Sequence, residues 1–295
     1  MLNKVKPYMM PVSMLAGSIF YGQFSRLTVL MPYMIFTMLF ITFSRLTFRK
    51  IRFSGKHLCM LFIQIVISIF LYFIIAPFNN IIAQGAMICI LMPTASSAPI
   101  ITGMLGGNVA SVSAYALVCN LGVALVAPML FSCIGQHSEA PFVESFIYIL
   151  SRMATLMVLP FVVAQIVRKF LPKVNQKILT VPNISFFIWT LALAVATAKT
   201  VDIVVQQTGN YAVETVIALV SLPICLCQFL AGRRIGKVFD DKIACGQSLG
   251  QKNTILGIWM CQTYLNPLAA IGPGAYILWQ NIVNSFQVWR NRKNL

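Results

Sequence analysis

The stretch "GQSLGQKNTILGIW" (residues 246–259) places a lysine inside a segment that is otherwise apolar enough for a lipid bilayer. Gly246 and Gly250 can loosen a helix there, and amide side chains lie on both sides of Lys252. A lysine at the centre of a membrane span costs roughly 2.5–3.5 kcal/mol. Lys252 is far from both ends of its apolar segment, so its side chain is not expected to reach the membrane interface. We therefore expect Lys252 to be functional.

The composition predicts an integral membrane protein. Of 295 residues, 59% are hydrophobic and only 9% are charged, whereas soluble domains average about 25% charged residues. The net charge of +16 is carried in short loops between apolar segments. This pattern follows the positive-inside rule, so we expect a lipid bilayer and not nucleic acid as the partner.

Apolar segments predict an all-α membrane protein with ten transmembrane helices, because each span needs roughly 20 apolar residues. With ten spans, both termini and the basic loops near 45–56, 168–177 and 233–242 share one side of the membrane. That side is the cytoplasm of an inner or plasma membrane. The predicted helices lie near 8–24, 27–44, 57–77, 79–104, 108–134, 143–170, 183–202, 210–231, 243–264 and 266–289.

Two of these helices are expected to be broken, at corresponding places in the two halves of the chain. Helix 4 contains "PTASSAP" (residues 93–99), and helix 9 contains the lysine stretch. Each is the fourth helix of a half that contains five helices. The first half covers about residues 5–134 and the second about residues 143–290. Because each half has an odd number of helices, two similar halves must cross the membrane in opposite orientations. Paired broken helices at corresponding places in such inverted halves indicate the central site of a transporter. The sequence therefore predicts a single transmembrane transporter domain that covers residues 1–295.

The break in helix 4 offers groups that could bind a ligand. Pro93 and Pro99 each remove a helix hydrogen bond, and backbone groups freed at membrane depth are tolerated only inside protein or beside a watery cavity. Hydroxyl oxygens from the same segment could satisfy them or bind a cation. Half-helix N-termini favour an anionic group. A kinked structural helix with locally satisfied hydroxyls is the alternative interpretation.

The sequence does not indicate an enzyme or a cofactor. His57 and His137 lie at loop edges, and no pair of carboxylates occupies a span. No Walker loop, HExxH motif or paired Cys/His metal spacing is present. We expect neither a metal nor an organic cofactor.

The broken segments resemble those of the bile acid:sodium symporter family, within the bile/arsenite/riboflavin transporter superfamily. That family's helix 4 reads Pro-Gly-Gly, Ser-Asn, Thr and then Gly-Asn-x-Ala. Counting back from Gly107 and Asn108 places Thr102 and Pro93 on their counterparts. The resemblance implies ten helices in inverted repeats, with a core domain (about 57–134 and 210–289) facing a panel domain (about 8–44 and 143–202). Substrate would move between the two by alternating access.

The chain departs from this family at the residues that bind sodium. Ala98 and Pro99 stand where the family has its Ser-Asn pair. The family's helix 9 carries Glu-x-x-x-Gln-Asn, and either Gln247 or Ser248 falls on the glutamate, depending on register. In both registers a carboxylate is lost and the cation of Lys252 is gained.

Charge repulsion then argues against sodium coupling. Two unit charges about 4 Å apart repel by roughly 4 kcal/mol at an effective dielectric near 20, which corresponds to about three powers of ten in affinity. We expect that Lys252 takes the place of a bound sodium ion, or alternatively that it carries a proton.

The sequence therefore predicts a secondary active transporter of a small or amphipathic organic anion. The rivals are a sodium-independent uniporter, exchanger or efflux carrier of the same superfamily, and a non-transporting membrane scaffold or sensor. The sequence makes no prediction of oligomeric state. The predicted substrate- or ion-binding residues are Gln64, Thr94, Ser96, Ser97, Pro99, Thr102, Asn108, Gln247, Ser248, Gln251, Lys252 and Asn253.

Overall fold

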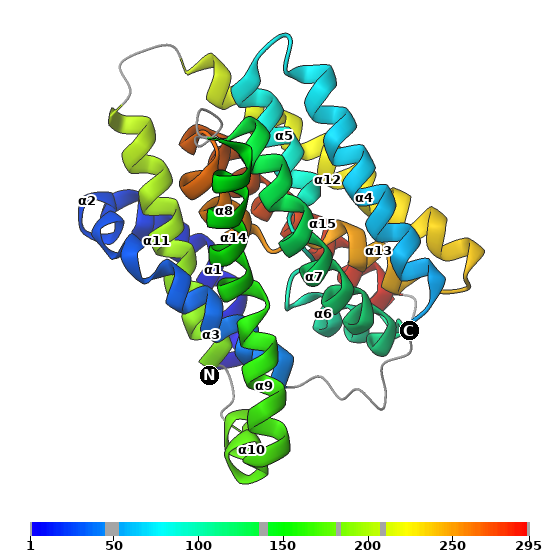
Figure 1. Cartoon of the computed structure of the whole chain (residues 1–295). Helices are drawn as coiled ribbons and strands as arrows, with labels where there is room; N and C mark the ends of the chain where they lie inside the picture. Colours follow the sequence, from blue (N-terminus) through cyan, green and yellow to red (C-terminus); the bar gives the residue numbers. More distant parts are fainter. Residues whose placement is uncertain (1, 45–52, 136–140, 181–183, 207–210, 294–295) are drawn as a thin grey trace. The chain divides into compact units, whose positions relative to one another are not determined.

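The computed structural model is helical throughout the part of the chain that it describes, residues 2–44, 53–135, 141–180, 184–206 and 211–293 (Figure 1). Its one β-type feature within those ranges is an isolated antiparallel bridge between Thr94 and Lys252. Four basic residues of the predicted loop near 45–56, Arg45, Arg49, Lys50 and Arg52, lie outside the described ranges, as does His137.

Six helical stretches among the described residues are long and apolar enough to cross a membrane. Two of the other predicted spans, 79–104 and 243–264, are built from shorter helices, of which α5 (Asn80–Leu91) is a short apolar one. The six stretches are Tyr21–Ser44, Gly55–Ile75, Val109–Ile134, Phe142–Phe170, Phe187–Gln206 and Ala212–Val238.

Helix α4 (Gly55–Ile75) has the pattern of a helix that faces lipid. Gln64 and Ser68 are buried, whereas Phe62 and Phe70 are 68% and 64% exposed. A helix of a water-soluble protein would bury the phenylalanines and expose the polar residues. The reversed pattern places the polar groups in the protein interior and the aromatic rings in hydrocarbon.

The chain divides into two compact units. Unit 1 comprises Met1–Arg45 and Arg152–Asn210, and unit 2 comprises Leu46–Ser151 and Tyr211–Leu295. Helix α8 (Phe142–Met157) contributes to both units.

Unit 1 differs in two places from the predicted helices. The predicted helix 8–24 is divided in the structure into α1 and α2. The predicted loop between the helices 143–170 and 183–202 contains a short helix, α10. Pro172 starts α10 because a proline at the first helical position needs no hydrogen-bonded N–H. The ring of Phe43 packs edge-on against that of Phe161, 5.5 Å between centroids. The helices of unit 1 are α1 (Leu2–Ile19), α2 (Tyr21–Phe24), η1 (Ser25–Leu30), α3 (Met31–Ser44), α9 (Leu159–Phe170), α10 (Pro172–Thr180) and α11 (Ile184–Gln206).

Unit 2 contains both predicted broken helices, and both are broken in the structure. The predicted helix 79–104 is α5 followed by α6, and the predicted helix 243–264 is α13 followed by α14. Besides α4 and α5, unit 2 contains α6 (Ala98–Met104), α7 (Val109–Ile134), α12 (Ala212–Val238), α13 (Lys242–Gly250), α14 (Thr254–Tyr264), η3 (Pro267–Ala270) and α15 (Ile271–Lys293).

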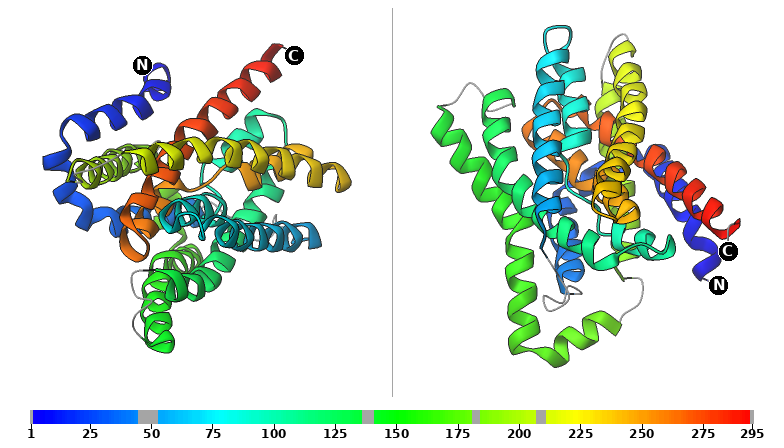
Figure 2. Two further views of the ribbon diagram at one scale, coloured as in Figure 1. Left: turned by 90° about the horizontal axis from the view of Figure 1, so that it is seen from above. Right: turned by 90° about the vertical axis from the view of Figure 1, so that its right-hand side faces the viewer.

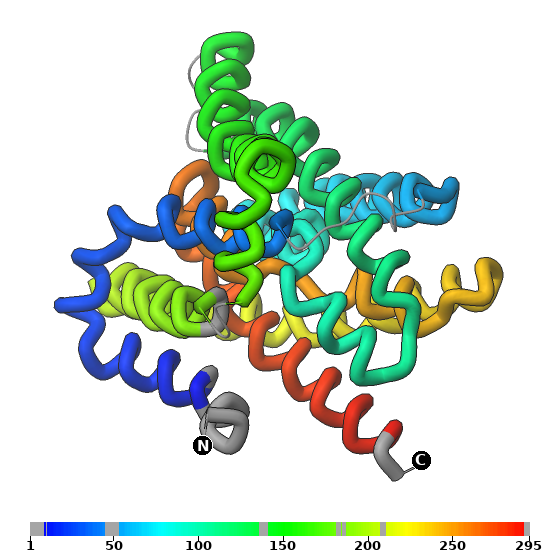
Figure 3. The backbone as a smooth tube through the Cα atoms, turned by 90° about the horizontal axis from the view of Figure 1, so that it is seen from below, coloured from blue at the N-terminus to red at the C-terminus, as the bar shows by residue number. Residues whose placement is uncertain are grey.

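Glycines let α13 pack closely against α12. The chain turns back between these helices, from yellow to orange in Figure 3. A Cβ atom at Gly232 would overlap the carbonyl oxygen of Cys245, and one at Gly236 would lie 2.7 Å from the Asp241 carbonyl oxygen. The close approach fixes the helix that leads into the second break.

Gly232→Ala is expected to lower the free energy of unfolding by about 1–3 kcal/mol, because the added methyl group separates two packed backbones. Gly274→Ala on α15 is the matched control. Its Cβ would meet no atom within 4 Å, so the lower flexibility of alanine should stabilise that helix by about 0.5–1 kcal/mol. Thermal unfolding of the purified variants measures both changes. Equal effects would show that the α12–α13 contact does not constrain α13.

Candidate functional site

The two helix breaks meet in unit 2 and pair with each other through their backbones. The amide of Asn253 donates to the carbonyl of Pro93 at 2.8 Å, and the amide of Ala95 donates to the carbonyl of Gln251 at 2.9 Å. These two bonds flank the Thr94–Lys252 bridge. Each break therefore supplies hydrogen-bond partners for backbone groups that the other has freed from its helix.

Local chemistry explains why the helices end and restart at these points. Pro93 has no N–H for a helical bond, and Pro99 lies in the first turn of α6, where a missing N–H has no cost. Asn253 caps α14 by accepting a hydrogen bond from the amide of Leu256 at 3.3 Å. The Thr94 hydroxyl donates to the carbonyl of Ser248 at 2.8 Å, which ties the first break to the end of α13.

Three side chains cap the carbonyl end of α5. The last carbonyls of a helix have no partner within it and carry its negative partial charge. The amide nitrogen of Gln228 donates to the Cys89 carbonyl at 3.1 Å. The ammonium of Lys252 donates to the Ile90 carbonyl at 2.8 Å. The amide nitrogen of Gln64 donates to the next carbonyl, that of Leu91, at 3.0 Å.

Lys252 is held by its backbone and by its side chain. Its N–H donates to the amide oxygen of Gln280 at 2.8 Å, and its carbonyl accepts from the Gln280 nitrogen at 3.3 Å. The residue is 1% exposed. Neither of the ion pairs Lys56–Asp241 and Lys199–Asp202 involves Lys252. Its charge is thus placed against the negative end of α5 and not against a carboxylate.

The end of α13 is capped in a similar way. The Tyr276 hydroxyl donates to the carbonyl of Gly250 at 2.8 Å and accepts from Gln228 at 2.9 Å. Gln228 therefore links the ends of both first half-helices. The last carbonyls of α5 and the carbonyl of Gly250 in α13 thus accept hydrogen bonds from side chains of the protein.

Several predicted site residues contribute polar atoms beside the breaks. The Gln251 nitrogen donates to the Ser97 hydroxyl at 2.6 Å. The Gln251 oxygen and the Thr102 hydroxyl are buried without a hydrogen-bond partner in the described structure. Ser96 lies half-buried in the same break as Ser97.

Gln247 and Ser248 take different roles. The Gln247 nitrogen donates to the side-chain oxygens of Asn284 at 3.0 Å and Gln287 at 3.1 Å, and therefore joins α13 to α15. Ser248 contributes its carbonyl, which accepts from Thr94. The two residues are buried within one helical turn of each other, so the structure does not choose between the two registers of the helix 9 motif.

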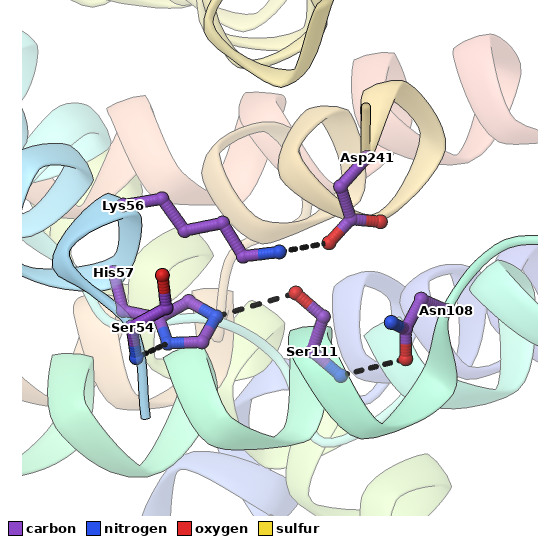
Figure 4. Close-up of polar contacts among 6 residues, drawn as sticks. All are labelled: Ser54, Lys56, His57, Asn108, Ser111 and Asp241. Atoms are coloured by element: carbon purple, nitrogen blue, oxygen red, sulfur yellow. Dashed lines mark hydrogen bonds and ion pairs between the residues drawn. The ribbon is translucent and has the colours of Figure 1, made fainter. Parts of the chain in front are cut away.

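Asn108 lies in a separate polar cluster at the start of α7 (Figure 4). Its side chain accepts from the amide of Ser111 at 3.1 Å, as an N-cap. The hydroxyl of Ser111 lies 3.2 Å from Nε2 of the buried His57. Nearby, Lys56 forms a 2.5 Å ion pair with Asp241, which joins α4 to the start of α13. The observed role of Asn108 is therefore to cap a helix, and His57, predicted at a loop edge, is buried.

Sequence reasoning missed Gln228, Tyr276 and Gln280, although each is a polar residue inside an apolar segment. That signal led to Gln64, whose oxygen also accepts from the Tyr115 hydroxyl at 2.8 Å. Asn120 is another polar residue inside an apolar segment, and its nitrogen donates to the carbonyl of Ala116 in its own helix at 2.7 Å.

The fold and this site define a helical membrane protein whose two broken helices pair at their breaks. The sequence profile of the SBF-like CPA transporter family matches residues 44–278, and the chain belongs to that family. No curated protein matches the chain. Membership in this family identifies the protein as a membrane transporter.

Lys252→Met is expected to raise the free energy of unfolding by about 1–4 kcal/mol, because it removes a buried charge that has no carboxylate partner. Gln64→Met is the matched control. It also leaves a carbonyl of α5 without its side-chain donor but removes no charge, and it should lower stability by about 1–3 kcal/mol. Thermal unfolding in detergent measures both. A loss of stability in both variants would mean that Lys252 acts only as a structural cap.

Proposed function

We propose that the protein is a secondary active transporter of a small or amphipathic organic anion, which works by alternating access without sodium. The observation that carries the proposal is the Lys252 ammonium, buried between the two breaks and donating to the Ile90 carbonyl. A fixed cation in this place favours an anionic substrate. It also disfavours a second cation nearby.

In this proposal the chain crosses the membrane ten times as two inverted five-helix repeats, with both termini cytoplasmic. Unit 2, with both broken helices, is the core domain, and unit 1 is the panel domain. The division of the chain into these units supports the assignment, although their boundary falls inside α8. The order of the breaks, one in each half, supports the inverted repeat.

Three features support an anion as substrate. An ammonium has three N–H donors, and the Ile90 carbonyl accepts one of those of Lys252. Helix α14 restarts after the second break, and helix N-termini carry positive partial charge. The unpartnered Thr102 hydroxyl can donate a further hydrogen bond. We propose that these groups receive the anionic group of the substrate.

The capping network supports sodium independence. Sodium sites in membrane transporters use unwound backbone carbonyls. Here Lys252, Gln64 and Gln228 already donate to the carbonyls at the end of α5. In the transport cycle Lys252 either stays as the resident cation or releases a proton, and a proton gradient imposed on proteoliposomes separates these two modes.

Purified protein screened against organic anions, from small carboxylates to taurocholate, is expected to gain thermal stability with at least one of them. A ligand at 100 times its Kd stabilises by about 2.7 kcal/mol. The gain should be the same in sodium chloride and in choline chloride. A non-transporting scaffold would show no gain with any anion.

Uptake of the stabilising anion into proteoliposomes should be unchanged when choline replaces sodium. Lys252→Gln removes the fixed cation but keeps a polar side chain, so its uptake should become sodium-dependent. Ser97→Ala is a control that keeps Lys252 and should remain sodium-independent. Strong sodium dependence of the wild-type protein would overturn the proposed role of Lys252.

A further inference from the structure

Helix α10 begins directly where a membrane span ends. The candidate span Phe142–Phe170 has 29 residues. A helix rises about 1.5 Å per residue, so this span exceeds the roughly 30 Å hydrocarbon core of a bilayer. The chain then turns at Leu171, and α10 runs crosswise to α9 (Figure 2, right). Residues 172–180 therefore begin where a candidate membrane span ends.

Helix α10 has one apolar and one polar side. At helical spacing Val174, Ile178, Asn175 and Leu179 share one side of α10, on which Asn175 is buried and Ile178 is half-buried. Leu171 is 51%, Val174 45% and Leu179 40% exposed. Lys173 and Lys177 share the opposite side with Gln176 and Thr180. Exposed apolar side chains beside lysines are typical of a helix that lies in the membrane interface.

The charged residues of the segment that contains α10 are all basic. No Asp or Glu occurs between residues 145 and 201, whereas Arg168, Lys169, Lys173 and Lys177 fall within ten residues of sequence. The Lys169 ammonium lies 5.3 Å from the centroid of the Phe170 ring, and that ring is itself 66% exposed. An aromatic ring beside a basic residue at the end of a span is a common interfacial anchor.

We propose that α10 lies in the headgroup layer and binds anionic phospholipid, with Lys173 and Lys177 contacting phosphate and Leu171, Val174 and Leu179 entering the acyl boundary. The bilayer covers these three exposed apolar side chains, because they adjoin the end of a membrane span. Anionic lipid matches the basic side, because no carboxylate of the same segment neutralises it. This site is independent of the transported substrate.

The test compares lipid binding to the full-length protein in neutral detergent. Native mass spectrometry measures bound phosphatidylglycerol and bound phosphatidylcholine with the same acyl chains. Each lysine near an anionic surface contributes about fivefold in affinity. The double variant Lys173→Gln and Lys177→Gln should therefore lose roughly 25-fold in phosphatidylglycerol affinity, with little change for phosphatidylcholine.

The matched control is Lys237→Gln with Lys242→Gln, which removes two exposed lysines from unit 2. It should retain phosphatidylglycerol binding, and Lys173→Arg with Lys177→Arg should restore it. Val174→Ser with Leu179→Ser should weaken both lipids alike. The proposal would be overturned if the wild-type protein bound the two lipids with equal affinity. It would also be overturned if the Lys237/Lys242 variant lost as much phosphatidylglycerol affinity as the Lys173/Lys177 variant, or if soluble polyglutamate bound as tightly as phosphatidylglycerol. Thermal unfolding verifies that the variants are folded.

Discussion

Backbone carbonyls at membrane depth have no water as a hydrogen-bond partner, and this constraint governs the centre of the protein. Each broken helix leaves carbonyls without helical partners. The structure satisfies them in two ways, by pairing one break with the other and by capping the half-helix ends with side chains. Gln64, Gln228 and Lys252 serve α5, and Tyr276 serves α13. The breaks can persist in a bilayer because these donors converge on them.

Lys252 differs from the other caps because it brings a full charge. Gln64 and Gln228 supply neutral donors to neighbouring carbonyls of the same helix end, so an amide in this region is sufficient for structure. A lysine there stores an electrostatic cost that the dipole of α5 offsets only in part, since a helix end contributes typically 0.3–1 kcal/mol. A buried lysine that lowers stability, at a place where a neutral amide could make the same hydrogen bond, is typical of a functional position.

Much of the fold and part of the site could be predicted from the sequence. Proline at positions 93 and 99, and glycine and asparagine at 250 and 253, act on their own helices, so both breaks were predictable from local chemistry. The interruption after Met157 and the existence of α10 were not, because a continuous apolar run and a basic loop carry no clear local signal for them. Asn108 was placed in the site by its motif, whereas its observed role as an N-cap is a local one.

The sequence by itself determined that the protein lies in a membrane, that two helices are broken, and that a lysine occupies one break. These properties depend on composition and on residues close together along the chain. Only the tertiary structure decided the partners of that lysine. Ile90 and Gln280 lie far from Lys252 in sequence, and a carbonyl becomes an acceptor only when folding brings it within hydrogen-bond distance. Side-chain pairing across helices is a property of packing, which hydropathy does not encode.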